Sequence, residues 1–399
     1  MDTQNTPVHI RLWNHDFWLL AIANMLLTMG VYIQMMNIPE LVKEYGGDAN
    51  VQIWSLGAYV IGLYAMGGFC SFLVQKYRRN RVCLQSLMVV MILLASPAFA
   101  GPVYRTNVVW ALPLLRFATG AFFGLAQMVL SSSLVIDCCE AHQRTEANYA
   151  TAWFYRLALS LGPLCALLLF RFADLRFATW FSVALVGLAF VLILFVRFPF
   201  RTPEDSVRRF SLDRFLLPRS WALFLQLIMV TMILGMVISL FFMDAHFFAW
   251  LMLGFLFALL AEKYVFVNAE LRSETVTGLL LLAAALLVKM TNDTSDVMFI
   301  VPVLTGLGSG LIGSRFLLFF IKLSDHCQRG TSQSTYFLAW ESGLSLGLCL
   351  GFMLVVDQEP WESVDNHLYV CVTALVMAVV ALLLYVGFTH RWYLRHKNR

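Results

Sequence analysis

Residues 220–262 read SWALFLQLIMVTMILGMVISLFFMDAHFFAWLMLGFLFALLAE, and apart from Glu262 at its end the only ionisable residues in this apolar run are Asp244 and His246. A helix needs about 20 mostly apolar residues to cross the ~30 Å hydrocarbon layer of a bilayer. The run is long enough for two crossings, with its polar pair near the middle, where the chain can turn. The stretch therefore predicts two antiparallel membrane-spanning helices, 220–243 and 245–262, joined by a tight turn.

The composition of the whole chain agrees with a lipid environment. Of its 399 residues, 60% are hydrophobic and only 13% are charged, whereas a soluble domain carries roughly 25% charged residues. The net charge of +4, without a basic element rich in stacking aromatics, does not indicate nucleic-acid binding. The eight cysteines show neither a disulfide framework nor zinc-ligand spacing, so we expect no metal and no cofactor.

The same length rule predicts an all-α membrane protein with twelve spans. The expected ranges are 17–38, 52–74, 82–101, 109–136, 147–170, 177–196, 220–243, 245–262, 275–290, 297–321, 333–356 and 367–388. Most of the 28 lysines and arginines fall in the segments that share a side with the two termini. Cytoplasmic segments are rich in basic residues, so both termini are expected in the cytoplasm, in the inner membrane if the protein is bacterial.

The longest polar connection divides the spans into two sets of six. We expect an N-terminal bundle over 1–196, a cytoplasmic linker over 197–219 and a C-terminal bundle with a basic tail over 220–399. TGAFFGL at 119–125 resembles TGLGSGL at 305–311, and LSLG recurs at 159–162 and 344–347 at nearly the same offset. These matches indicate two pseudo-symmetric halves, an arrangement found in transporters. We expect a monomer.

The connection after the second span reads GGFCSFLVQKYRRNR over residues 67–81. It resembles the loop 2–3 signature of the major facilitator superfamily, in which glycine is followed four residues later by aspartate and then by alternating basic residues. Ser71 and Gln75 stand at the glycine and aspartate positions. The basic positions are occupied by Lys76, Arg79 and Arg81. The resemblance implies a conformational role for this loop, with the aspartate's charge lost at Gln75.

The fourth span carries Arg116, Gly120 and Gly124, which resembles that family's pattern of an arginine followed by glycines at i+4 and i+8. Glycines at this spacing let a neighbouring helix approach closely, and Gly306 and Gly310 repeat the pattern in the second half. Arg116 lies inside the predicted span, where an arginine is costly unless it is paired or faces water. Snorkelling to the outer interface is the alternative.

Arg156 and Glu341 occupy matching positions of the two repeats, in the fifth and eleventh spans. Each falls near mid-membrane by the helix rise, and Glu341 is the only carboxylate that we place inside a span. Ionisable groups at this depth mark functional sites, so we expect Glu341 to carry a coupling proton or bind a cationic group, with Arg156 as its counter-ion or an anion binder. A structural ion pair between the two is the alternative.

Asn24, Thr28 and Tyr32 are spaced by four residues and therefore share one face of the first span. In the family that the loop resembles, the first span lines the central cavity, so these residues are candidates for a substrate wall; hydrogen bonding between helices is the alternative. Arg315 in the tenth span either lines the cavity or snorkels.

The resemblance implies a secondary active transporter (a permease working by symport or antiport) that moves a small solute by alternating access, coupled to protons. The apolar, aromatic-rich spans favour efflux of an amphiphilic compound. The chain contains no phosphate-binding GxxxxGK[ST] loop and no HExxH or GxSxG motif, so we do not expect an enzyme. A transporter-derived sensor or scaffold without transport activity is the alternative, and a membrane-embedded transferase is a third reading.

Overall fold

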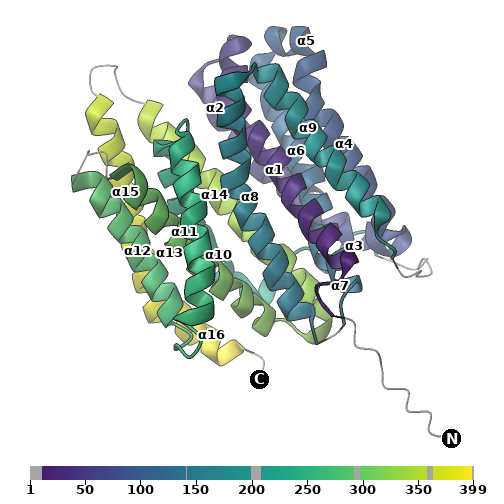
Figure 1. Cartoon of the computed structure of the whole chain (residues 1–399), viewed down its shortest axis with the longest axis vertical. Helices are drawn as coiled ribbons and strands as arrows, with labels where there is room; N and C mark the ends of the chain where they lie inside the picture. The colour runs from purple at the N-terminus through teal and green to yellow at the C-terminus, as the bar shows by residue number, and fades with distance from the viewer. Residues whose placement is uncertain (1–10, 141, 199–207, 292–296, 357–362, 398–399) are drawn as a thin grey trace, which may run out of the picture.

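The computed structural model describes residues 11–140, 142–198, 208–291, 297–356 and 363–397 (Figure 1). Within these ranges the regular secondary structure is helical. Eleven helices are long and apolar enough to cross a membrane, or twelve if α2 and α3 form one bent span. The helices are α1 (His15–Glu44), α2 (Ala49–Ala65), α3 (Gly67–Lys76), α4 (Arg79–Phe99), α5 (Gly101–Thr106), α6 (Val108–Val129), α7 (Val135–Asp137), α8 (Arg144–Phe172), α9 (Leu175–Phe195), α10 (Trp221–Leu240), α11 (Ala245–Tyr264), α12 (Ser273–Thr291), α13 (Val297–Leu323), α14 (Arg329–Val356), α15 (Ser363–Leu384) and α16 (His390–His396).

The all-helical membrane fold predicted from the sequence is confirmed, with every predicted span represented by a helix. Most helices run a few residues past the predicted ends, because their polar first and last turns lie outside the apolar runs. The second span differs most, since α2 and α3 meet at an angle of 41° next to Met66. The turn predicted at Asp244 is present, and its carboxylate accepts a hydrogen bond from the His246 backbone nitrogen at 2.9 Å, which caps the start of α11.

The helices form two groups that lie side by side in Figure 1, the early one purple to teal and the later one green to yellow. In the first group α1 packs on α8 and α9, and α2 packs on α6. In the second group α10 packs on α14, and α11 packs on α13. We call the groups, α1–α9 and α10–α16, the N-terminal and C-terminal halves. They meet mainly where α2 contacts α14 and where α8 contacts α11 and α13. The boundaries predicted at 196 and 219 stay a prediction, and residues 199–207 of the predicted linker lie outside the described residues.

Glycines stand where helices approach most closely. A Cβ at Gly120 would lie 2.3 Å from the Tyr59 carbonyl oxygen of α2, and one at Gly124 would lie 2.9 Å from the Leu63 carbonyl oxygen. In the second half, a Cβ at Gly306 would lie 2.4 Å from the Leu251 carbonyl oxygen. Gly310 likewise faces Ala258 of α11. The glycine pairs named in the sequence therefore lie at the α2–α6 and α11–α13 contacts.

One of the closest of these contacts allows a prediction about stability. A Cβ at Gly347 of α14 would lie 2.1 Å from the Met232 carbonyl oxygen of α10, so Gly347→Ala forces two backbones apart. Overpacking of this kind costs about 1–3 kcal/mol, and close packing is what holds helices together in lipid. We expect a lower thermal unfolding midpoint for the purified variant in detergent. Gly57→Ala is the control, because a Cβ at Gly57 meets nothing within 4 Å, and an unchanged midpoint for Gly347→Ala would contradict the packing argument.

Candidate functional site: a buried carboxylate held by three tyrosines

Glu341 lies near the middle of α14 and is fully buried. Its carboxylate belongs to the C-terminal half but accepts hydrogen bonds from three tyrosines of the N-terminal half. Tyr32 of α1 and Tyr155 of α8 donate to Oε1, and Tyr59 of α2 donates to Oε2 at 2.7 Å. We call Glu341 with these three residues the tyrosine cluster. It joins three helices of one half to one helix of the other.

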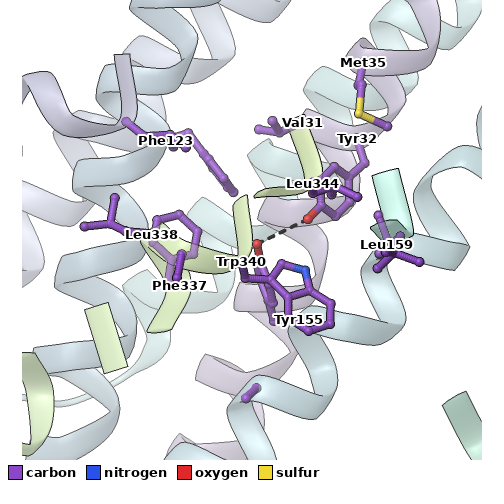
Figure 2. Packing of buried hydrophobic residues seen from close by; sticks show 14 of the residues in the cluster. Val31, Tyr32, Met35, Phe123, Tyr155, Leu159, Phe337, Leu338, Trp340 and Leu344 are labelled. Carbon is purple, nitrogen blue, oxygen red and sulfur yellow. Dashed lines mark hydrogen bonds between the residues drawn. The ribbon is translucent and has the colours of Figure 1, made fainter. Parts of the chain in front are cut away.

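The tyrosine cluster is enclosed by aromatic side chains. Figure 2 shows the Tyr32 and Tyr155 hydroxyls facing one another, with 3.2 Å between the two oxygens. The Phe337 ring lies 5.7 Å from the Tyr155 ring, and the Phe123 ring lies 6.3 Å from the Tyr59 ring. Burying an ionised carboxylate in such surroundings is costly unless hydrogen bonds satisfy it. The three hydroxyl donors therefore make a charged Glu341 tolerable at this position.

Arg116 of α6 lies against the same cluster and is only 2% exposed. Its guanidinium carbon lies 4.5 Å from the centroid of the Tyr59 ring, and its Nη1 donates to Gln34 Oε1 at 3.3 Å. Arg116 therefore does not snorkel to the interface. Tyr59 links it to Glu341, since the ring contacts the guanidinium while the hydroxyl bonds the carboxylate.

Arg156 of α8 is fully buried and turned towards the C-terminal half. Its Nη1 donates to the Gly310 carbonyl oxygen at 3.0 Å and to the Ser314 hydroxyl, both on α13. The guanidinium also lies over the Trp153 ring, 4.2 Å from its centroid. No ion pair joins Arg156 to Glu341 in the described parts of the chain. The alternative of a structural ion pair is therefore wrong, and so is the idea of Arg156 as a direct counter-ion in this conformation.

The two pseudo-symmetric residues nevertheless share one feature. Arg156 reaches from the N-terminal half to α13, and Glu341 reaches from the C-terminal half to α1, α2 and α8. Each repeat thus places an ionisable side chain across the boundary between the halves. A movement of one half relative to the other must break or exchange both sets of bonds.

The polar stripe of α1 lies next to the cluster. Asn24 Nδ2 donates to the Thr151 carbonyl oxygen of α8 at 3.2 Å, and Gln127 Nε2 of α6 donates to the Thr28 hydroxyl at 2.8 Å. Asn24 also lines a small cavity of about 10 Å³ together with Tyr155, a volume near the minimum for one water. The stripe therefore forms the interhelical hydrogen bonds of the alternative reading and also borders the cluster.

Arg315 does not join the tyrosine cluster. It forms a two-bond ion pair with Glu274 of α12, in which Arg315 Nε donates to Glu274 Oε2 at 2.6 Å and Nη2 donates to Oε1. The side chains are only 13% and 5% exposed. Glu274 lay just outside the predicted ninth span, so the expectation that Glu341 is the only carboxylate within a span is wrong. Glu262 of α11 is a third case, and it accepts a hydrogen bond from Tyr149 of α8.

The loop 2–3 residues lie at the end of the bundle that carries α16, the start of α1 and the linker (Figure 1); we call this the linker end. Arg79 forms an ion pair with Asp137 of α7, and the Lys76 ammonium lies 5.3 Å from the Phe72 ring centroid. Arg81 is exposed, and Gln75 is half-buried on α3. Arg79 is therefore the one of these four that is held in an ion pair within the described chain.

The opposite end of the molecule is hollowed. A cavity of about 990 Å³ lies between the end of α1, the α8–α9 turn and the α10–α11 turn. Its charged lining residues are Glu40, Lys43, Glu44, Arg171, Asp174 and Asp244, with His246 beside them. Both halves contribute to its walls, so an opening between the halves exists at the end away from the linker. We call it the vestibule.

Sequence reasoning missed Tyr59 and Tyr155, two of the three donors to Glu341. Tyrosine is common in apolar spans, and a period of four on one helix does not reveal which neighbours share a partner. Tyr155 precedes Arg156 directly, which is the one signal that could have drawn attention to it. The described residues hold no cluster of three or more His, Cys, Asp or Glu side chains able to bind a metal ion.

The comparisons with known proteins agree with this architecture. A family model described as Major Facilitator Superfamily matches residues 20–262. The crystal structure of the human organic anion transporter MFSD10 (TETRAN) superposes with a TM-score of 0.70 at 14% identity, over 93% of this chain and 98% of that one. The crystal structure of a bacterial homologue of the iron transporter ferroportin, in an outward-facing state, gives a TM-score of 0.65 at 14% identity, over 96% and 99%.

At 14% identity these two structures share the fold with this chain and no more. No curated protein sequence matches it. The family model, by contrast, covers more than half of the chain and includes the loop 2–3 segment and the Arg116 helix. The chain belongs to the Major Facilitator Superfamily and is a multi-pass integral membrane transporter.

Proposed function

We propose that this protein is a secondary active transporter that couples the movement of a small solute to protons, with Glu341 as the proton-carrying group. The supporting observation is the tyrosine cluster, in which one half supplies the carboxylate and the other half supplies its three donors. The protonation state of this carboxylate is therefore coupled to the relative position of the halves. Proton-coupled alternating access depends on such a coupling.

Protonation changes the hydrogen bonds that the Glu341 side chain can form. An ionised carboxylate only accepts hydrogen bonds, whereas the protonated acid also donates one. If the halves separate at the cluster, an ionised Glu341 loses its three donors, which costs free energy because hydrogen bonds to a charged group are stronger than average. A protonated Glu341 avoids that cost. Proton binding therefore favours the conformational change, and proton release favours the conformation described here.

The substrate that we propose is a small amphiphilic compound with an anionic group. Arg116 Nε and Arg156 Nη2 are buried and have no hydrogen-bond partner within the described chain, and aromatic rings surround the site. MFSD10, which shares the fold, is described as an organic anion transporter. The vestibule is the proposed entrance or exit. We further propose a monomer with both termini cytoplasmic, in the inner membrane if bacterial, and export as the direction.

Reconstitution into liposomes that contain a pH-sensitive dye tests this function. The wild-type protein should produce internal pH changes when amphiphilic organic anions are added, and smaller or no changes with sugars or amphiphilic cations. A response to an added cation or sugar instead would correct the substrate class. The absence of any response, from a protein that binds one of the compounds in a separate assay, would favour the sensor alternative over transport.

A further inference from the structure

At the linker end, the described residues of the linker pack against helices of the bundle. Phe215 and Phe210 lie directly over Gly67 and Gly68 of α3, where an added Cβ would meet their rings at 2.0 and 2.1 Å. The Ser211 backbone nitrogen donates to the Gly68 carbonyl oxygen at 3.0 Å. The described part of the linker, from residue 208 onward, is therefore fixed to the N-terminal half.

The same segment is also bonded to the C-terminal half. The Thr331 hydroxyl of α14 donates to Asp213 Oδ1 at 3.1 Å and accepts from the Arg214 backbone nitrogen at 2.9 Å. The Leu217 backbone nitrogen donates to the Thr335 hydroxyl at 2.8 Å. On the other side, the Ser71 hydroxyl of α3 donates to Asp213 Oδ2 at 3.4 Å. The linker thus bridges the two halves.

Arg214 has an unusual backbone for its residue type. Its φ of 59° places a non-glycine residue in the left-handed region, at a cost of roughly 1–2 kcal/mol. Its side chain is only 19% exposed and donates from Nη1 to the Ser133 hydroxyl at 2.5 Å. Burial, followed by the nearby Arg79 charge, lowers the pKa of the Arg214 guanidinium below its ordinary value. The inward position of the Arg214 guanidinium is therefore kept at a cost in folding stability. Strain of this kind concentrates at functional sites.

Arg214 lines a cavity of about 190 Å³ where the linker meets the two halves, and we call this cavity the arginine pocket. Its charged lining is Arg79, Arg144, Arg214 and Arg329, with Asp137 and Asp213. Among the described residues, four positive groups face two negative ones, and Arg144 Nε is buried without a hydrogen-bond partner there. The first turn of α14 also lines the pocket, and a helix N-terminus favours anions. The pocket is much larger than the roughly 10–15 Å³ that a single water needs.

We infer that the arginine pocket binds a phosphate-class dianion, either a soluble phosphate or phosphate monoester or the phosphate of a lipid headgroup. Arginine is suited to this ligand because its planar donors match phosphate oxygens. Within the described lining, four arginines outnumber two aspartates, which favours an anion, and an anion at Arg144 supplies the missing acceptor. Asp213 and Asp137 hold the neighbouring arginines in place. Their negative charges repel an anion unless it can donate a hydrogen bond to them.

Binding has a consequence for the conformational equilibrium. The pocket is walled by α4, α7 and α8 of the N-terminal half, by the linker and by α14 of the C-terminal half, so separation of the halves at this end dismantles it. A ligand that binds only one conformation stabilises that conformation. Phosphate therefore slows exchange between conformations. This effect on rate rests on the proposed transport function, whereas the binding itself does not.

The test is thermal unfolding of the full-length protein in detergent with inorganic phosphate, against sodium chloride at equal ionic strength. We expect phosphate to raise the unfolding temperature of the wild type, and Arg144→Gln to weaken the apparent affinity about ten- to hundredfold, the worth of a hydrogen bond between charged groups. Arg81→Gln is the matched control, because Arg81 is an exposed arginine at the same end and outside the pocket.

A second arm distinguishes the source of the phosphate. The protein is placed in nanodiscs of phosphatidylcholine with or without phosphatidic acid, and the same unfolding temperature is measured. A shift with phosphatidic acid alone, lost in Arg144→Gln, assigns the pocket to a lipid headgroup; a shift with free phosphate assigns it to a soluble ligand. If neither shifts the wild type, or if Arg144→Gln and Arg329→Gln both respond as the wild type does, the inference is overturned. Neither arm requires transport, so a failure of the proposed function would not be mistaken for a failure of the pocket.

Discussion

Liposomes that carry the Glu341→Gln variant should show no substrate-driven proton movement, a loss of at least a hundredfold against the wild type. Glutamine keeps the size of the side chain and can still accept hydrogen bonds from Tyr32 and Tyr155 through its amide oxygen. It cannot bind and release a proton. The variant should therefore fold, bind substrate and lose coupling, which a dye assay for internal pH and a separate binding assay measure together.

Glu262→Gln is the matched control for this variant. Glu262 is also a carboxylate that crosses between the halves to a tyrosine, because Tyr149 of α8 donates to it from the facing half. It lies two residues from the end of α11, away from the tyrosine cluster. Proton movement should survive in this variant. If it is lost with Glu262→Gln and retained with Glu341→Gln, the coupling site is at Glu262 and our assignment is wrong.

Glu274→Gln should destabilise the folded protein by about 3–5 kcal/mol, because it leaves the buried Arg315 charge without its partner. The pair is held by two hydrogen bonds, and both side chains are more than four-fifths buried. Water cannot reach this position to offset the free-energy cost of a buried charge that has lost its counter-charge. The expected observation is a strong fall in the unfolding temperature of the purified protein and a low yield of monodisperse material.

Two further variants separate this effect from a general loss of charge. Glu40→Gln removes one partner of the exposed Lys43–Glu40 pair and should change stability by less than about 1 kcal/mol. The double variant Glu274→Leu with Arg315→Met removes both buried charges and should recover much of the stability lost in Glu274→Gln. A double variant less stable than Glu274→Gln would show that the pair itself, and not the unpaired charge, carries the energy.

The fold could be predicted from the sequence because it depends on a property that each segment carries alone. A helix that crosses lipid must be apolar over its whole length and must satisfy its backbone internally, so each span is visible without knowledge of its neighbours. The bend between α2 and α3 was not predicted, although Gly67 and Gly68 directly after Met66 are residues at which a helix bends readily.

The site was predictable only in part, for a related reason. Glu341, Arg156 and Arg116 are conspicuous because ionisable residues are rare in apolar spans. Their partners are tyrosines, serines and backbone carbonyls, which occur throughout such spans and carry no distinguishing pattern. That Arg156 bonds α13 and not Glu341 depends on how the two halves meet, and the same holds for Asp213, whose role depends on where the linker docks.

The tyrosine cluster also sets a limit on energetics. Under the proposal that Glu341 carries the coupling proton, its single carboxylate would move one proton for each turnover of the site. One pH unit corresponds to about 1.4 kcal/mol, which sustains roughly a tenfold concentration ratio of solute at a stoichiometry of one to one. In the proposed export, a monovalent anion leaves as a proton enters, and each movement is equivalent to one positive charge moving inward. The membrane potential, worth about 2.3 kcal/mol per charge at 100 mV, would therefore add to the pH difference in setting the solute ratio.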